Sequence, residues 1–216
     1  MNNLIPGTLF GVALNYRGLL ESRLEEFQQP PYQKPPVKPV LFIKTANTRN
    51  ADGQPVVQPA GERLQPGPAL GVVIGKRASR VSVEQALEHV AGYTIVNEFS
   101  LPEESYYRPA VKAKCRDGFC SIGPVVVPSS EVANPQALTL QLHVNGELRQ
   151  ENSTANMVRS VAELIAELSE FMTLEEGDLL ITGTPEGRVD VLPGDTVVVS
   201  ITGLGQLTNH VVADAK

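Results

Sequence analysis

The sequence is poor in cysteine, in histidine and in clustered positive charge, and each shortage excludes a class of protein. Its two cysteines, Cys115 and Cys120, are separated by four residues and have no histidine nearby, which makes a poor zinc site. In a cytoplasmic chain we expect both to be reduced thiols. The net charge of −6, without a Lys/Arg-rich run, argues against nucleic acid or an anionic membrane surface as a partner.

Long apolar runs are also missing. No stretch approaches the roughly 20 residues that span a membrane, and the opening MNNLIPGTLFGVAL lacks the basic segment of a secretion signal. We therefore expect a cytoplasmic protein with no membrane partner. A length of 216 residues, of which 42% are apolar, is enough to bury a substantial core, so we expect one domain over 1–216.

Several catalytic signatures are absent as well. A phosphate-binding P-loop would need glycine at position 70 and a hydroxyl at position 77, where the chain has Leu70 and Arg77. Neither the dinucleotide fingerprint, nor the nucleophile elbow, nor the HExxH zinc signature occurs. The three histidines, His89, His143 and His210, have no visible partner, so we expect structural roles for them.

What the chain does contain is a series of short β-branched runs separated by turn residues. These runs predict strands at 8–16, 40–44, 70–77, 93–96, 124–128, 138–150 with an Asn145–Gly146 turn, 179–185, 196–201 and 206–212. Apolar residues at helical spacing predict helices over 82–91, with a Ser82/Gln85 capping box, and over 155–172. The balance predicts a β-rich α+β domain.

Two polar segments, 22–39 and 45–66, interrupt this pattern. The first becomes proline-rich, which prevents a regular element, and we expect both to be loops or lids. Mixed charges fill 97–120, directly after a predicted strand, where polar sites often lie. The run ITGTPEGR at 181–188 ends a strand at a tight turn whose backbone N–H groups and hydroxyls suit an anion. For each run alone, a solvated loop or a simple turn is the more common explanation.

Taken in order, the segments ALNYR, VLFIK, LGVVIGKR, AGYTIVNEFS, VKAKCRDGF, VNGELRQ, LLITGTPEGR and PGD resemble the fumarylacetoacetate hydrolase family over residues 8–212. The resemblance implies a mixed β-roll with a few helices, often dimeric, that handles 2-oxo or enol dicarboxylic acids with Mg²⁺ or Mn²⁺. Residues 100–120 are similar to the amino-terminal half of two-domain members that isomerise and decarboxylate such acids in aromatic catabolism.

The chain departs from the family pattern at its metal ligands. Two glutamates are expected two and four residues before Gly71, where the chain has Ala69 and Gly67. The third ligand, usually aspartate, aligns with Glu98, which becomes the one candidate metal ligand of the chain. In the family's lid motif the histidine and glutamate are replaced by Leu19 and Ser22.

What remains of the family's site is a set of candidate substrate-binding and catalytic residues. The resemblance implies Lys114 as the catalytic group, by electrostatics or proton donation. It implies substrate binding by Asn15, Arg17, Lys44, Arg108, Thr182, Gly183, Thr184 and Pro185.

Three functions remain open. In the first, the chain is the amino-terminal subunit of an isomerase/decarboxylase and assembles, as a homodimer or hetero-oligomer, with a paralogous carboxyl-terminal subunit that carries the Mg²⁺ or Mn²⁺. In the second it is a non-catalytic scaffold or dicarboxylate-binding subunit. In the third it is a stand-alone metal-dependent acylpyruvate-type hydrolase, with Glu98 joined by Glu103 or Glu104 as replacement ligands.

Overall fold

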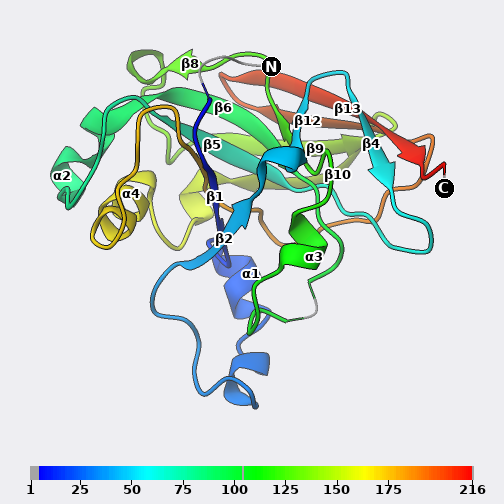
Figure 1. Cartoon of the computed structure of the whole chain (residues 1–216), viewed down its shortest axis with the longest axis horizontal. Helices are drawn as coiled ribbons and strands as arrows, with labels where there is room; N and C mark the ends of the chain where they lie inside the picture. Colours follow the sequence, from blue (N-terminus) through cyan, green and yellow to red (C-terminus); the bar gives the residue numbers. More distant parts are fainter. Residues whose placement is uncertain (1–4, 104, 216) are drawn as a thin grey trace.

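A computed structural model describes residues 5–103 and 105–215, and within these ranges the chain forms two β-sheets with a few short helices (Figure 1). The first sheet consists of β1 (Leu9–Ala13), β2 (Val40–Lys44), β3 (Arg49–Ala51), β5 (Pro68–Ile74), β6 (Val90–Glu98), β7 (Cys120–Ile122), β8 (Val127–Pro128) and β11 (Leu179–Ile181). The second consists of β4 (Pro55–Gln58), β9 (Thr139–Val144), β10 (Glu147–Ser153), β12 (Thr196–Ile201) and β13 (Gly205–Ala213). The helices are α1 (Arg17–Glu21), α2 (Val83–Ala86), α3 (Val111–Lys114) and α4 (Val161–Ser169).

The first sheet is mixed and carries the functional region. Its strands follow the order β2-β1-β11-β5-β6-β7-β3, with β8 paired to β6. The pairs β1–β11 and β3–β7 are parallel and the others antiparallel. Every residue of β5 is buried, which explains why its sequence is a continuous apolar run and does not alternate. The predicted β-rich α+β fold is confirmed.

The second sheet closes the other side of the core. Its strand β12 alternates between partly and fully buried residues, as expected for a sheet with one covered face. Val197 and Val199 of β12 share one hydrophobic cluster with Leu70 and Val72 of β5. The turn between β9 and β10 has positive φ at Asn145 (53°) and Gly146 (83°), as the Asn-Gly signal predicted.

Both predicted helices are shorter than their periodicity indicated. The helix predicted over 82–91 ends at Ala86, continues as a 3-10 turn, and gives way to β6 at Val90; the Ser82 side chain makes no capping bond. The His89 carbonyl accepts from Gly75 N at 2.8 Å, so pairing of the chain with the end of β5 replaces helical bonding here.

The second helix also begins later than its apolar spacing predicted. α4 starts at Val161, and the Ser160–Glu163 capping box fixes that start. Residues 154–156 form a separate 3-10 turn before it. α2 and α4 lie against each other at one end of the molecule (Figure 1).

The two expected loop segments differ from each other. Segment 45–66 contains β3 and β4, so it is not an open loop. Segment 22–39 is irregular apart from a 3-10 turn at Glu26–Gln28, and it projects from the body of the molecule beside α1 (Figure 1). We call it the lid segment. In the described part of the chain, no helix is long and apolar enough to cross a membrane.

Candidate functional site

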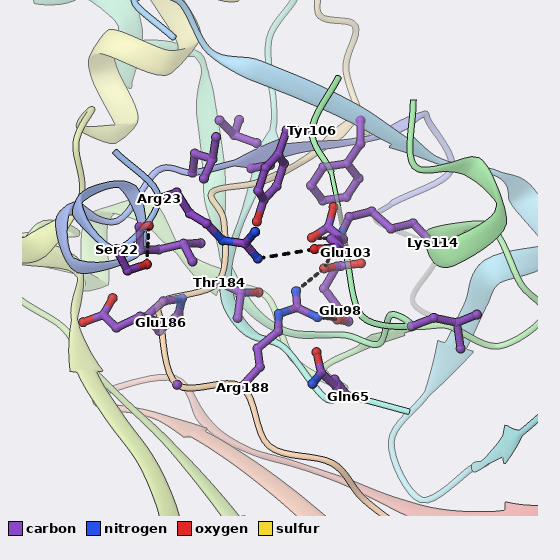
Figure 2. A pocket seen from close by; sticks show the side chains of 18 residues that line it. Ser22, Arg23, Gln65, Glu98, Glu103, Tyr106, Lys114, Thr184, Glu186 and Arg188 are labelled. Carbon is purple, nitrogen blue, oxygen red and sulfur yellow. Dashed lines mark hydrogen bonds and ion pairs between the residues drawn. The ribbon is translucent and has the colours of Figure 1, made fainter. Parts of the chain in front are cut away.

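A cavity of about 340 Å³ lies between the lid segment and the first sheet (Figure 2). Its charged lining comes from five places along the chain: the lid segment, the end of β6, the loop after it, α3, and the run after β11. The charged residues that line it are Arg23, Glu98, Glu103, Lys114, Glu186 and Arg188.

Glu98 is the centre of this site. It is the last residue of β6 and 1% exposed, and its N–H donates to the Gly67 carbonyl at 2.7 Å. Its Oε1 lies 2.6 Å from Lys44 Nζ. Its Oε2 lies 2.8 Å from Lys114 Nζ and 2.6 Å from Arg188 Nη2. Three cations therefore surround one buried carboxylate.

The protonation of Glu98 follows from these neighbours. Burial alone would raise its pKa, but the charges of Lys114, Lys44 and Arg188 outweigh burial, so the pKa of Glu98 lies far below its ordinary value. Burial lowers the pKa of Lys44, and the charge of Glu98 opposes that change. Glu98 is therefore ionised at neutral pH and serves as a fixed counterion.

All the hydrogen-bond donors of the Lys44 ammonium are taken up by groups within the protein. Besides Glu98, its ammonium donates to the carbonyls of Phe99 (2.7 Å), Lys114 (2.7 Å) and Phe119 (2.9 Å). The side chain is completely buried and does not line the cavity. An ammonium group has three protons, whereas Glu98 and the three carbonyls offer four acceptor oxygens, so no donor is left for a ligand. Lys44 thus ties β2 to the end of β6, which carries Glu98, and to α3, which carries Lys114.

Lys114, the predicted catalytic residue, does line the cavity. Besides Glu98 it contacts Glu103 Oε2 at 3.2 Å, and its Nζ lies 4.3 Å from the centre of the Phe42 ring. The side chain is 2% exposed. A charged ammonium held this way is placed to meet negative charge on a small ligand.

The residues present do not fit Mg²⁺ or Mn²⁺. These hard cations need several oxygen ligands, and Gly67 and Ala69 supply no side-chain oxygen. A Cβ on Gly67 would lie 2.8 Å from Arg188 Nη2 and 2.8 Å from Thr184 Oγ1, so the guanidinium takes the space of a longer side chain there. Within residues 5–103 and 105–215 no three His, Cys, Asp or Glu side chains gather as a metal site. Both oxygens of Glu98 face cations.

The other predicted substrate-binding residues fall into two groups. Thr184 and Pro185 line the cavity. Thr182 instead donates its hydroxyl to the Leu70 carbonyl at 3.0 Å, and Asn15 Nδ2 donates to the Thr182 carbonyl at 2.9 Å. These two buried residues hold the TGTP turn in place.

Gly183, Arg17 and Arg108 lie outside this cavity lining. Gly183 adopts φ 110°, and a Cβ there would lie 2.7 Å from the Val12 carbonyl, so the turn needs glycine. Arg17 is exposed and donates to the Ala155 carbonyl at 3.0 Å. Arg108 is exposed and borders two neighbouring clefts.

Sequence reasoning missed Arg23, Tyr106, Glu186 and Arg188. The two arginines stand in segments that we had singled out, the lid segment and ITGTPEGR, and a basic residue in each was the available signal. Burial raises the pKa of Tyr106 to about 12, so its hydroxyl is a neutral donor. Glu186 Oε1 accepts from Asn152 at 3.0 Å, and its carboxylate turns away from the other charges (Figure 2).

Comparison with known proteins places these observations in a family. Residues 8–212 match the family described as fumarylacetoacetate (FAA) hydrolase C-terminal. The 4-hydroxyphenylacetate degradation bifunctional isomerase/decarboxylase of Salmonella dublin is 48% identical over 97% of this chain and 48% of its own length. Oxaloacetate tautomerase YisK of Bacillus subtilis is 37% identical over 82% of this chain and 62% of its own. The chain thus spans about half the length of the first of these relatives.

Solved structures show the same fold. The 5-carboxymethyl-2-hydroxymuconate delta-isomerase of Mycobacterium smegmatis is 31% identical, with a TM-score of 0.84 over 99% of this chain and 81% of that one. The fumarylpyruvate hydrolase of Pseudomonas aeruginosa, in complex with Mn²⁺ and pyruvate, is 30% identical, with a TM-score of 0.81 over 96% of this chain and 90% of that one. Members of the fold therefore include a protein that binds Mn²⁺, whereas the described residues of this chain do not form a fitting ligand set.

Proposed function

Because the chain belongs to the fumarylacetoacetate hydrolase family, we propose that it is the amino-terminal subunit of an isomerase/decarboxylase of aromatic catabolism. Its substrates would be 2-oxo and 2-hydroxy-diene di- and tricarboxylates, namely 5-oxopent-3-ene-1,2,5-tricarboxylate for decarboxylation and 2-hydroxyhepta-2,4-diene-1,7-dioate for isomerisation. The observation that carries the proposal is the floor of the cavity. There three cations surround Glu98 in a chain that matches half of a two-activity relative.

The proposal includes a partner. Since the ligand set here does not fit Mg²⁺ or Mn²⁺, the metal would belong to a second, paralogous copy of the fold that corresponds to the carboxyl-terminal half. The two copies would act together as a hetero-oligomer. The alternative assembly is a homodimer of this chain. A cytoplasmic location stays a prediction.

The chemistry that this chain can offer is electrostatic. Both proposed reactions build negative charge on the oxygen of an enolate, when carbon dioxide leaves or when a proton moves. Lys114 and Arg188 face the cavity as preorganised cations, and such groups stabilise charge that develops in a transition state. Tyr106, whose pKa is raised to about 12, is a neutral O–H donor in the same lining.

The test is a reconstitution. Both partial reactions are followed by the absorbance of the conjugated acids, with this chain alone, with a metal-carrying copy alone, and with the two mixed. We expect the mixture to run at least one step that the metal-carrying copy runs poorly by itself. Full rates for both steps from the metal-carrying copy alone would contradict the proposal.

A second candidate, a non-catalytic dicarboxylate-binding subunit, is favoured by one observation: Glu98 and Glu103 offset two of the three positive charges of Lys44, Lys114 and Arg188, which leaves one positive charge for binding an anion. The variant Lys114→Ala distinguishes the catalytic subunit from the binding subunit. Loss of an acid–base or charge-stabilising group costs about 10²-fold or more in rate, whereas a binding subunit would leave turnover of the mixture nearly unchanged. Lys112→Ala, which changes an 82% exposed side chain in the same helix, is the matched control.

The third candidate, a stand-alone hydrolase, finds less support. It needs Glu103 or Glu104 beside Glu98 as a metal ligand. Glu103 pairs with Lys114 at 3.2 Å, and Glu104 lies outside the described residues.

A further inference from the structure

Two guanidinium groups line the cavity, and they reach it from different segments of the chain (Figure 2). Arg23 belongs to the lid segment, and Arg188 follows the TGTP turn after β11. We propose that they form a two-point clamp for a dicarboxylate, in which Arg188 binds the 2-oxo-acid end and Arg23 the distal carboxylate. Arg23 is then the residue that selects di-acids over mono-acids. The inference rests on the proposed function for its ligand class, but it concerns binding by this chain alone.

Arg188 is anchored yet keeps free donors. Its Nη2 donates to Glu98 Oε2 at 2.6 Å and its Nη1 to the Glu98 carbonyl at 3.4 Å. A guanidinium carries five N–H groups, so these two bonds leave donors for a ligand. Burial lowers the pKa of Arg188, but the charge of Glu98 more than compensates, so the group stays charged. Its fork suits the planar, bidentate geometry of a carboxylate.

Arg23 is held in a similar way by the lid segment. Its Nη1 donates to Glu26 Oε2 at 2.7 Å and its Nη2 to the Glu103 carbonyl at 3.3 Å. The guanidinium lies 5.4 Å from the centre of the Tyr106 ring. The side chain is only 31% exposed, and two of its five N–H groups are used, which again leaves donors that face the cavity.

Aromatic packing holds the part of the lid segment that carries Arg23 in place. Phe27 of the lid segment packs edge-on against Tyr32, with ring centres 5.0 Å apart. The Tyr32 hydroxyl accepts from Tyr106 N at 2.6 Å and lies 2.9 Å from Ser105 Oγ. These contacts fix the lid segment to the loop that follows β6, so Arg23 meets a ligand from a defined wall.

The charges and the size of the cavity suit a small di-acid. On the floor, Lys44, Lys114 and Arg188 exceed Glu98 and Glu103 by one positive charge. Arg23 adds a second positive centre, which Glu26 balances from the side. The remaining lining carboxylate, Glu186, accepts a hydrogen bond from Asn152 and turns away from these cations (Figure 2). The volume of about 340 Å³ is at the small end of the roughly 300–1,000 Å³ range of small-molecule sites.

The test compares two acids that differ only in the distal carboxylate. Calorimetric titration of the whole chain, in excess EDTA, uses 2-oxoheptanedioate and 2-oxoheptanoate. We expect the di-acid to bind about 10- to 100-fold more tightly, the scale of one charge-assisted pair. Arg23→Gln should reduce di-acid affinity to the mono-acid level and leave mono-acid affinity unchanged. Arg188→Gln should weaken both acids about 10-fold or more.

The controls separate charge from fold. Arg77→Gln removes an exposed arginine that pairs with Glu175 outside the cavity, and it should leave both affinities unchanged. If Arg188→Gln fails to fold by circular dichroism, Arg188→Lys keeps the charge but loses the fork, and it should still weaken both acids. Equal binding of the two acids by the unmodified chain, or an Arg23→Gln variant that weakens both acids equally, would overturn the clamp.

The outcome is independent of the reconstitution experiment. Binding in EDTA needs neither a second copy of the fold nor turnover. If the mixture shows no gain in rate but Arg23→Gln loses di-acid preference, the proposed reaction fails and the clamp stands. If turnover requires the chain but the two acids bind alike, the clamp fails and the proposed function stands.

Discussion

Replacing Glu98 by glutamine is the sharpest test of how the cavity floor is held together. The change keeps the size of the side chain and removes its charge, which leaves Lys44, Lys114 and Arg188 around a neutral group. Removing one partner of a buried ion pair typically costs about 3–5 kcal/mol, because the remaining charge is left uncompensated. For a protein of this size each kcal/mol lowers Tm by about 2–4 °C, so we expect Tm to fall by roughly 6–20 °C.

The assay is urea unfolding followed by circular dichroism, with calorimetry for Tm. Glu62→Gln is the matched control, since its ion pairs with Lys112 and Arg116 are long, at 3.6 Å each, and lie at the surface. That change should stay within about 0.5 kcal/mol of the unmodified chain. A Glu98→Gln variant that loses less than about 1 kcal/mol would refute the reasoning, because the three cations would then be balanced by something other than Glu98.

Three further outcomes follow from the same geometry. Gly67→Ala should destabilise the fold by about 1–3 kcal/mol in urea unfolding, because its Cβ would meet the Glu98 carbonyl and Arg188; unchanged stability would contradict this packing. The pKa of Glu98 in the folded chain lies below its unfolded value of about 4.3, so the stabilisation by Glu98 is complete above that pH and is lost as the pH falls. Urea unfolding between about pH 5 and 2 should therefore show a steeper loss of stability for the unmodified chain than for Glu98→Gln. Equal slopes for the two proteins would contradict this prediction. Glu103→Gln frees Lys114 from one carboxylate and should tighten di-acid binding in titrations, whereas Glu62→Gln, with the same change in charge, should not; equal effects of both would mean that only net charge matters.

Much of the fold could be predicted because its signals are local. The strand at Val40–Lys44 and the turn at Asn145–Gly146 follow from side chains that prefer those conformations wherever they occur. The helix predicted over 82–91 is shorter than predicted, for the opposite reason. There the residues around His89 pair with the end of β5, and no local pattern encodes that pairing.

The site shows the same division. The loss of carboxylates at Gly67 and Ala69 could be read from the sequence by resemblance to the family. The residue that fills the space of the missing side chain at Gly67 could not be predicted from the sequence. It is Arg188, which is distant in the sequence and comes close to Gly67 only in the folded chain. Arg23 was hidden for a similar reason: its role depends on the packing of the lid segment against Tyr106.

The central claim is that cations, and not a metal ion, form the floor of this cavity. It is tested most directly by titrating Mn²⁺ into the purified chain, with and without 2-oxoheptanedioate, and following free Mn²⁺ by electron paramagnetic resonance. We expect no saturable Mn²⁺ binding in either case, and the same affinity for the di-acid with Mn²⁺ or with EDTA. Stoichiometric Mn²⁺ binding that the di-acid strengthens would contradict the account.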